Sequence, residues 1–348
     1  MMRRTHWIIA AAILFGLLAG DVAYWRIAAE RLRTGYQDWL AGRTTEGWEV
    51  HSGAMSIGGW PGAAQVSVQN LTLRHAGNAI PGDIQIAAAG VDLSVSLLDP
   101  ATLKLSLTGP AHVRAADFPD MIVTSQENAV SVPLLSGGRR RFELNARSLR
   151  IEPASGAWHT TLGLLNATAD AAVPLASGQP GSAVTFSASA EAIALPALVK
   201  WPLGSNISSV TLGGSLNGPI PQTRDLTAWA EAWRDGGGSL AISRFTMGWG
   251  PLGLTSSATL ALDDQLQPMG SGNGRVVGYA ATLDKLAANG ILTKSAVTAA
   301  KAVLSLMAGA GDPDQPSTVD VPLTLQYRTL SMRQVPLLRF PELDWPAH

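Results

Sequence analysis

Residues 91–108 read Val91-Asp-Leu-Ser-Val-Ser-Leu-Leu-Asp-Pro-Ala-Thr-Leu-Lys-Leu-Ser-Leu-Thr108. On both sides of Asp99-Pro100, a dipeptide typical of turns, apolar residues occupy every second position. Side chains along a strand alternate between the two faces of a sheet, so each half predicts a half-buried strand with one apolar face. The stretch therefore predicts two antiparallel strands joined by a short turn.

The same period of two recurs along most of the chain after Thr45. It is found at Val66/Val68, Leu71/Leu73, Phe142–Ala146, Val184–Ala192, Leu254–Leu262 and Val319–Tyr327. The continuous apolar strands of a parallel α/β sheet are missing. We therefore predict a mainly β protein, built from curved antiparallel sheets that form either a groove or a closed sandwich.

Helices are predicted in only a few places after the N-terminus, near residues 225–234 and 281–307, where apolar residues follow the helical period. A stretch rich in Gly, Pro and Ser around residues 176–181 indicates a boundary. We therefore expect two β-rich halves, residues 46–180 and residues 181–348, with both helical regions in the second.

The N-terminus carries an apolar segment. Trp7–Gly20 has no charge, Asp21 interrupts, and Val22–Trp25 completes the run. A helix over residues 7–25 is about 28 Å long at about 1.5 Å per residue, close to the thickness of a hydrocarbon core. We predict a signal-anchor transmembrane helix at residues 7–25, with Trp7, Tyr24 and Trp25 at the membrane interface. A cleaved signal peptide is the alternative, although small residues are poorly spaced for cleavage.

The regions flanking this segment suggest its orientation. Residues 1–6 contain Arg3 and Arg4 and are expected to form a cytoplasmic tail, which places the bulk of the chain outside the cytoplasm. Residues 26–45 have helical apolar spacing and are expected to form a helical stalk, which either continues the anchor or binds a partner.

Composition excludes some functions and the motifs indicate no chemistry. A formal net charge of −1 argues against nucleic-acid binding, and the absence of cysteine removes disulfides, thiolate metal sites and thiol nucleophiles. The histidines do not form a metal-binding spacing, and neither a P-loop nor a G-x-S-x-G elbow is present. No catalytic, metal or cofactor residue is predicted, and an enzyme is not expected.

A combination of short motifs resembles a known family. The basic start and single apolar segment precede an early Gly59-Trp-Pro61 turn, and the second half contains Trp249-Gly-Pro-Leu252 and Val321-Pro-Leu-Thr324. Together they resemble domain-of-unknown-function family 2125, uncharacterised envelope proteins of Gram-negative bacteria. The resemblance implies a single-pass inner-membrane protein with most of its chain in the periplasm. It carries no catalytic residue. More remotely, the architecture resembles AsmA-type proteins, whose curved sheets form apolar grooves for lipid.

These observations leave three hypotheses for the function. The first is an anchored envelope protein whose apolar β groove binds or passes lipid, with the lipid bilayer as a partner. The candidate groove residues are Leu103, Leu105, Leu107, Leu254, Leu260 and Leu262. The second is a structural or assembly factor that contacts another envelope protein and has a closed sandwich without a ligand. A hydrolase ranks last, because no catalytic constellation assembles from the sequence.

Overall fold

The computed structural model describes residues 2–76, 83–115, 118–134, 138–172, 182–221, 223, 225–308, 318–332 and 335–345. Within these ranges, only the backbone is described at residues 2–14, 17, 172, 182 and 306–308. The chain is mainly β and its strand pairs are antiparallel, as the alternating pattern predicts. It divides into two compact units, which are described separately below.

Unit 1 comprises Met1–Gly77, Gly82–Thr124 and Asn128–Leu135. It begins with helix α1 (Met2–Thr45), which runs without a break through the predicted anchor and stalk. The described residues that follow form seven strands: β1 (Glu49–His51), β2 (Met55–Gly58), β3 (Ala63–His75), β4 (Ile84–Ser96), β5 (Thr102–Ala115), β6 (Met121–Thr124) and β7 (Glu127–Pro133). The stretch quoted first thus forms the end of β4, the turn and the start of β5.

Three long strands form the centre of the unit 1 sheet, in the order β3–β4–β5. The outer edge of β3 pairs with β2 near Val66 and with β1 near Leu73. The outer edge of β5 pairs with β7 near Leu103 and with β6 near His112. The phase of β3 switches at Asn70, where a φ of 51° lets both Val68 and Leu71 be buried.

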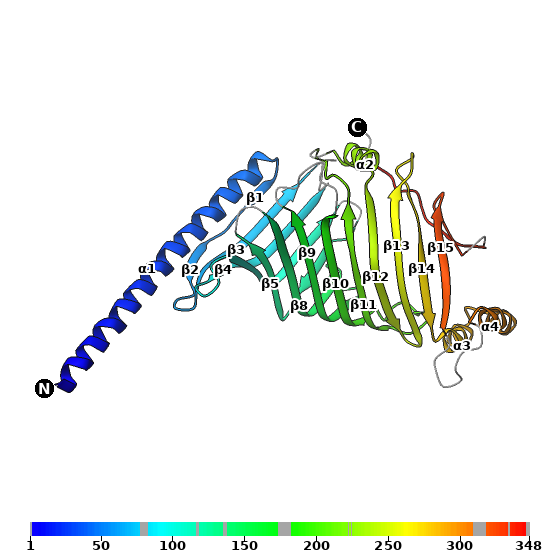
Figure 1. Ribbon diagram of the computed structural model, residues 1–348, viewed down its shortest axis with the longest axis horizontal. Helices are drawn as coiled ribbons and strands as arrows, with labels where there is room; N and C mark the ends of the chain where they lie inside the picture. The colour runs from blue at the N-terminus through cyan, green and yellow to red at the C-terminus, as the bar shows by residue number, and fades with distance from the viewer. Residues whose placement is uncertain are drawn as a thin grey trace. The chain divides into compact units, whose positions relative to one another are not determined.

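The part of helix α1 that was predicted as a stalk packs on one face of this sheet (Figure 1). The contact stripe follows a spacing of three or four residues along the helix, at Trp25, Ala29, Leu32, Tyr36 and Leu40. Tyr36 packs against Val66, Val68 and Leu93, and its hydroxyl lies 3.0 Å from Oγ of Ser52. The helix supplies the second layer that a one-sided apolar sheet needs.

The early Gly-Trp-Pro turn contacts helix α1 where the helix begins to pack on the sheet. This turn joins β2 to β3, and the Trp60 indole donates to Oδ2 of Asp21 over 3.0 Å. The Trp25 indole donates to the backbone oxygens of Gly58 (3.2 Å) and Ala63 (3.1 Å), the residues at the ends of these two strands. Packing on the sheet thus begins within the segment that was predicted as a membrane span.

No helical stretch is long and apolar enough to cross a membrane among the residues whose side chains the structure describes. The predicted span at residues 7–25 lies partly outside them, because the side chains at positions 7–14 and 17 are not described.

Unit 2 comprises Asn78–Pro81, Ser125–Glu127 and Ser136–His348. Its strands are β8 (Arg139–Pro153), β9 (Thr160–Ala172), β10 (Ser182–Ala194), β11 (Asn206–Asn217), β12 (Ser239–Trp249), β13 (Leu252–Leu262), β14 (Pro268–Val277), β15 (Thr318–Gln326), β16 (Thr329–Met332) and β17 (Val335–Arg339). Each strand pairs with the next one in the chain. The boundary expected near residue 180 falls inside this unit, because β9 and β10 pair directly, with Ala171 opposite Val184.

Where the connections of this sheet are described, they contain three helices. Helix α2 (Leu226–Asp235) joins β11 to β12 at one end of the strands, and α3 (Tyr279–Ala288) and α4 (Lys294–Ala308) join β14 to β15 at the other (Figure 1). They agree with the helices predicted near 225–234 and 281–307. Asp225 caps α2 by accepting from the amide of Ala228 over 2.7 Å. The buried Trp233 holds α2 in place by donating to the Asn217 carbonyl over 3.1 Å.

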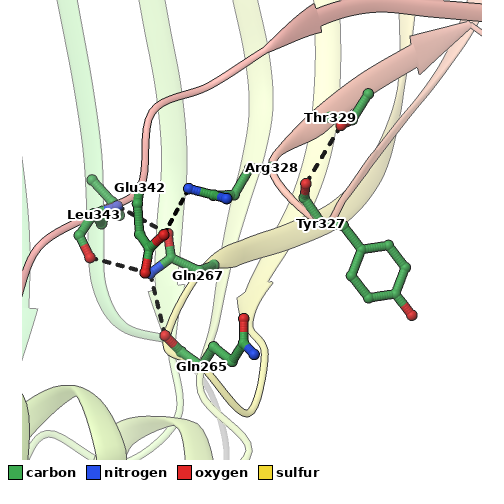
Figure 2. Close-up of polar contacts among 7 residues, drawn as sticks. All are labelled: Gln265, Gln267, Tyr327, Arg328, Thr329, Glu342 and Leu343. Atoms are coloured by element: carbon green, nitrogen blue, oxygen red, sulfur yellow. Dashed lines mark hydrogen bonds and ion pairs between the residues drawn. The ribbon is translucent and has the colours of Figure 1, made fainter.

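The C-terminal segment is fastened to the turn between β13 and β14 (Figure 2). The buried Gln267 side chain donates to the Leu343 carbonyl over 3.1 Å and accepts from the Leu343 amide over 2.9 Å. The Trp345 indole donates to the Leu266 carbonyl, and Arg328 pairs with Glu342 over 2.8 Å. These bonds hold the segment after β17 against unit 2.

Candidate functional site

An apolar cavity of about 670 Å³ lies in unit 1 between α1 and the sheet. Its walls are mostly aliphatic and aromatic, as is common in sites for small apolar ligands, which typically measure about 300–1,000 Å³. The lining residues are Tyr24, Ile27, Ala28, Arg31, Leu32, Gly35, Tyr36 and Trp39 from α1, and Leu71, Val91, Leu93, Val95, Pro100, Leu103, Leu105, Val132 and Leu134 from the strands and their connections.

Strand register builds the sheet wall. Leu93 lies directly opposite Leu105, and Val95 lies opposite Leu103, so the alternating residues of β4 and β5 share one face. Val132 of β7 is opposite Leu103 and extends this face by one strand. The period of two that predicts the fold therefore also supplies one wall of the cavity.

Helical spacing builds the opposite wall. Residues 24, 27, 28, 31, 35 and 39 lie three or four positions apart and form a second stripe on α1, beside the stripe that packs on the sheet. Gly35 leaves the middle of this wall open, because a Cβ atom built there has no neighbour within 4 Å. The cavity therefore extends along a helix face that carries a gap instead of a side chain.

Polar groups in the cavity wall are few. Arg31 is the one charged residue among the described residues that line it. Tyr36 contributes a phenol, and burial raises its pKa above the usual value, against the lowering effect of the hydrogen bond with Ser52. At neutral pH the site thus contains one permanent positive charge in an otherwise neutral lining.

The structure brings together only some of the predicted groove residues. Leu103 and Leu105 line the cavity, whereas Leu107 is 41% exposed and lies outside the lining. Leu254, Leu260 and Leu262 belong to β13 in unit 2, where they are half-buried.

The residues predicted at the membrane interface lie in different places. Tyr24 lines the cavity, and Trp25 is bonded to the hairpin of β2 and β3. The side chain of Trp7 lies outside the described residues. Arg31 and Gly35 also line the cavity, and the sequence did not single them out as site residues. Ile27, Arg31 and Gly35 are spaced four residues apart, and this spacing predicts that they lie on one face of the helix.

Unit 2 carries a second apolar surface, on one face of its sheet. Directly paired residues share this face across five strands: Ala169 with Phe186, Ala188 with Leu212, Leu212 with Phe245, and Leu240 with Leu260. Phe186, Leu212, Phe245 and Leu260 are half-buried rather than buried. Many of the buried residues of unit 2 lie instead near the ends of the strands, including Leu203, Ile220, Trp233, Leu266 and Tyr279.

A metal site needs several ligating side chains, such as His, Asp and Glu, close together. The part of the chain that the structure describes contains no group of three His, Cys, Asp or Glu residues placed to hold a metal ion. His112 and Arg114 approach Asp120 only to 3.9 Å, which is too long for a hydrogen bond, and the side chains of His112 and Arg114 are exposed.

The fold and the cavity together define an antiparallel β protein whose N-terminal helix covers one sheet face and encloses an apolar space. The chain belongs to the family described as "Uncharacterized protein conserved in bacteria (DUF2125)", whose model matches residues 25–341. The matched range contains both hairpin turns with the Gly, Trp and Pro residues noted in the sequence. No curated protein and no solved structure matches the chain.

Proposed function

We propose that this protein is a membrane-anchored envelope protein that binds the acyl chain of a lipid in the cavity between α1 and the unit 1 sheet. The observation that carries the proposal is the cavity itself, about 670 Å³ in volume and lined largely by Leu, Val and aromatic side chains. Apolar surface in contact with water is costly, and an acyl chain would remove that surface from water.

The half-buried face of unit 2 supports the same function. A sheet with one apolar face normally packs it against a second layer. Leu254 and Leu260 lie on such a face without becoming fully buried. We propose that this face also contacts acyl chains. Leu254, Leu260 and Leu262, which the sequence predicts as groove residues, would then bind lipid as well.

The membrane anchor is part of the proposal. Trp7–Gly20 is uninterrupted apolar sequence, and α1 continues from it into the stripe that packs on the sheet. We propose that this run holds the protein in the inner membrane as an uncleaved anchor, with residues 1–6 in the cytoplasm and the rest in the periplasm. The same helix, α1, would then lie in the membrane at its N-terminal part and line the cavity with its later residues.

The second candidate is a structural or assembly factor that contacts another envelope protein. This hypothesis requires that the apolar sheet faces pack against each other in a closed sandwich that holds no ligand. It has less support, because the strands described within each unit form one layer and α1 covers the sheet of unit 1.

The lipid content of the purified full-length protein tests the binding function. We expect wild-type protein extracted in a nonionic detergent to carry lipid that native mass spectrometry detects. Leu105→Asp places a carboxylate in the cavity wall and should reduce that lipid severalfold. Leu107→Asp is the matched control, because Leu107 lies on the same strand and outside the lining. Wild-type protein without lipid, or equal lipid in both variants, would contradict the proposal.

Cysteine labelling tests the topology against a clean background, because the natural chain contains no cysteine. Ser257→Cys adds a thiol at an exposed position of β13. We expect a membrane-impermeant maleimide to label it in spheroplasts, whereas Thr5→Cys should react only after the membrane is permeabilised. The reverse pattern would refute the proposed orientation.

A further inference from the structure

The strongest unassigned feature of unit 1 is the position of Arg31 in the wall of the apolar cavity. Its side chain also lines an adjoining surface groove, together with Arg26, Glu30, Thr34 and Asp38. Arg31 is therefore placed where the apolar space meets solvent-exposed polar residues. A long arginine side chain can lie along an apolar surface while its guanidinium group remains in water.

The neighbours of Arg31 on the helix do not neutralise it. The positions that could pair with it are residues 27, 28, 34 and 35, which are Ile, Ala, Thr and Gly. Other arginines on the same helix do have a carboxylate three residues away: Arg33 pairs with Glu30, and Arg43 pairs with Glu46. The contrast distinguishes Arg31 from these ordinary surface arginines.

The two carboxylates that line the groove beside Arg31 are Glu30 and Asp38. Glu30 accepts hydrogen bonds from Nε of Arg33 over 3.0 and 3.1 Å, and this contact lowers the pKa of Glu30, so its charge is already paired. Asp38 lies seven residues further on, about 10 Å along the helix axis at about 1.5 Å per residue. That spacing is beyond the three or four residues at which side chains on one helix pair directly.

We propose that the cavity selects an amphiphile with an anionic head, whose acyl chain lies among Leu93, Leu103 and Leu105 and whose carboxylate or phosphate pairs with Arg31. The inference rests on the proposed lipid function of the cavity. Arginine suits this role because its planar guanidinium donates two parallel hydrogen bonds to a carboxylate or a phosphate. A fatty acid and an anionic phospholipid share this chemistry.

The test compares probes that differ only in head group, with the full-length protein in nonionic detergent and native mass spectrometry as the readout. Oleate against oleyl alcohol isolates the charge of a fatty acid. Phosphatidylglycerol against phosphatidylcholine of the same chains isolates the net charge of a phospholipid. We expect wild-type protein to prefer the anionic member of a pair about tenfold, the scale of one charge-assisted hydrogen bond. The pair that shows the preference identifies the source of the head group.

Three variants separate the outcomes. Arg31→Gln should remove the preference while neutral probes still bind, and Arg31→Lys should restore most of it. Arg244→Gln removes the same charge from unit 2, at an exposed position, and should leave the preference unchanged. If wild-type protein binds charged and neutral probes equally, or Arg31→Gln keeps the preference, the head-group inference is overturned while the lipid function stands. If no probe binds, both are overturned.

Discussion

Asp21 accepts a hydrogen bond from the Trp60 indole over 3.0 Å, which links the charge that interrupts the N-terminal apolar run to the turn between β2 and β3. Two indoles thus hold α1 at one edge of the unit 1 sheet, since Trp25 donates to both ends of the same turn. The apolar cavity begins beside this point, at Tyr24. We therefore expect these contacts to affect the position of the helix and, with it, the width of the cavity.

The pair of Asp21 and Trp60 should contribute measurably to docking of the helix. Trp60→Phe and Asp21→Ala should each lower the protection of α1 amides between residues 25 and 40 by about fivefold in hydrogen exchange. This corresponds to about 1 kcal/mol, the usual scale of a hydrogen bond at a partly exposed site. The double variant should cost no more than either single variant, because each removes the same bond. Fully additive losses would show that the bond does not couple these residues.

Gln267 should be required to hold the C-terminal segment. Gln267→Ala removes three hydrogen bonds made by a side chain that is only 3% exposed and leaves the Leu343 amide without that partner. We expect a loss of about 1–3 kcal/mol and faster proteolysis after residue 335. Gln265→Ala is the control, because Gln265 contributes only its backbone carbonyl to this cluster. Equal proteolysis of the two variants would argue against a role for the Gln267 side chain.

Gly238 should tolerate no side chain. A Cβ atom at this position would lie 2.3 Å from the ring of Trp233, the residue that holds α2 against the sheet. Gly238→Ala should therefore destabilise unit 2 by about 1–3 kcal/mol, as overpacking of a core typically does. Gly58→Ala, with no neighbour within 4 Å, is the control for the substitution itself. Thermal melts that do not distinguish the two variants would contradict the close packing.

Leu260 tests whether the apolar face of unit 2 is accessible. An aspartate buried without a partner is severely destabilising, whereas a hydrated one costs little. Because Leu260 is half-buried, we expect Leu260→Asp to fold with a modest decrease in melting temperature and with less bound lipid. Ala230→Asp, at a fully buried position in α2, should unfold unit 2. It shows how large the loss of stability is when an aspartate is buried. Comparable unfolding in both variants would favour a covered face at Leu260.

The sequence predicts the fold well and the cavity only in part. Alternation at Val91, Leu93 and Leu105 identifies both the strands and their apolar face, because the two-residue period is a local property of the chain. It does not reveal which layer covers that face, since α1 and β4 are distant in sequence. Leu107 follows the same alternation as Leu105 yet lies outside the cavity lining and is 41% exposed. Alternation alone does not distinguish the two residues.

The N-terminal helix shows the same limit. The apolar spacing of Leu32, Tyr36 and Leu40 predicts an amphipathic helix. The position of Trp25 at the end of the apolar run predicts a residue at the membrane interface. In the structure, the Trp25 indole donates hydrogen bonds to backbone carbonyls of the hairpin, a contact that composition does not predict. Arg31 is unremarkable among the basic residues of the sequence until the strands place an apolar cavity beside it.

The most direct test of the central claim is to fill the cavity without disturbing the sheet. Gly35→Phe adds a ring at a residue of the cavity wall that has open space around its Cβ position. Gly42→Phe makes the same change on the same helix, also without a neighbour within 4 Å and outside the lining. Both variants replace a helical glycine and should retain the fold. We predict that Gly35→Phe loses most of the lipid that native mass spectrometry detects on the wild-type protein, and that Gly42→Phe retains it. Equal lipid on the two folded variants would contradict a binding site between α1 and the sheet.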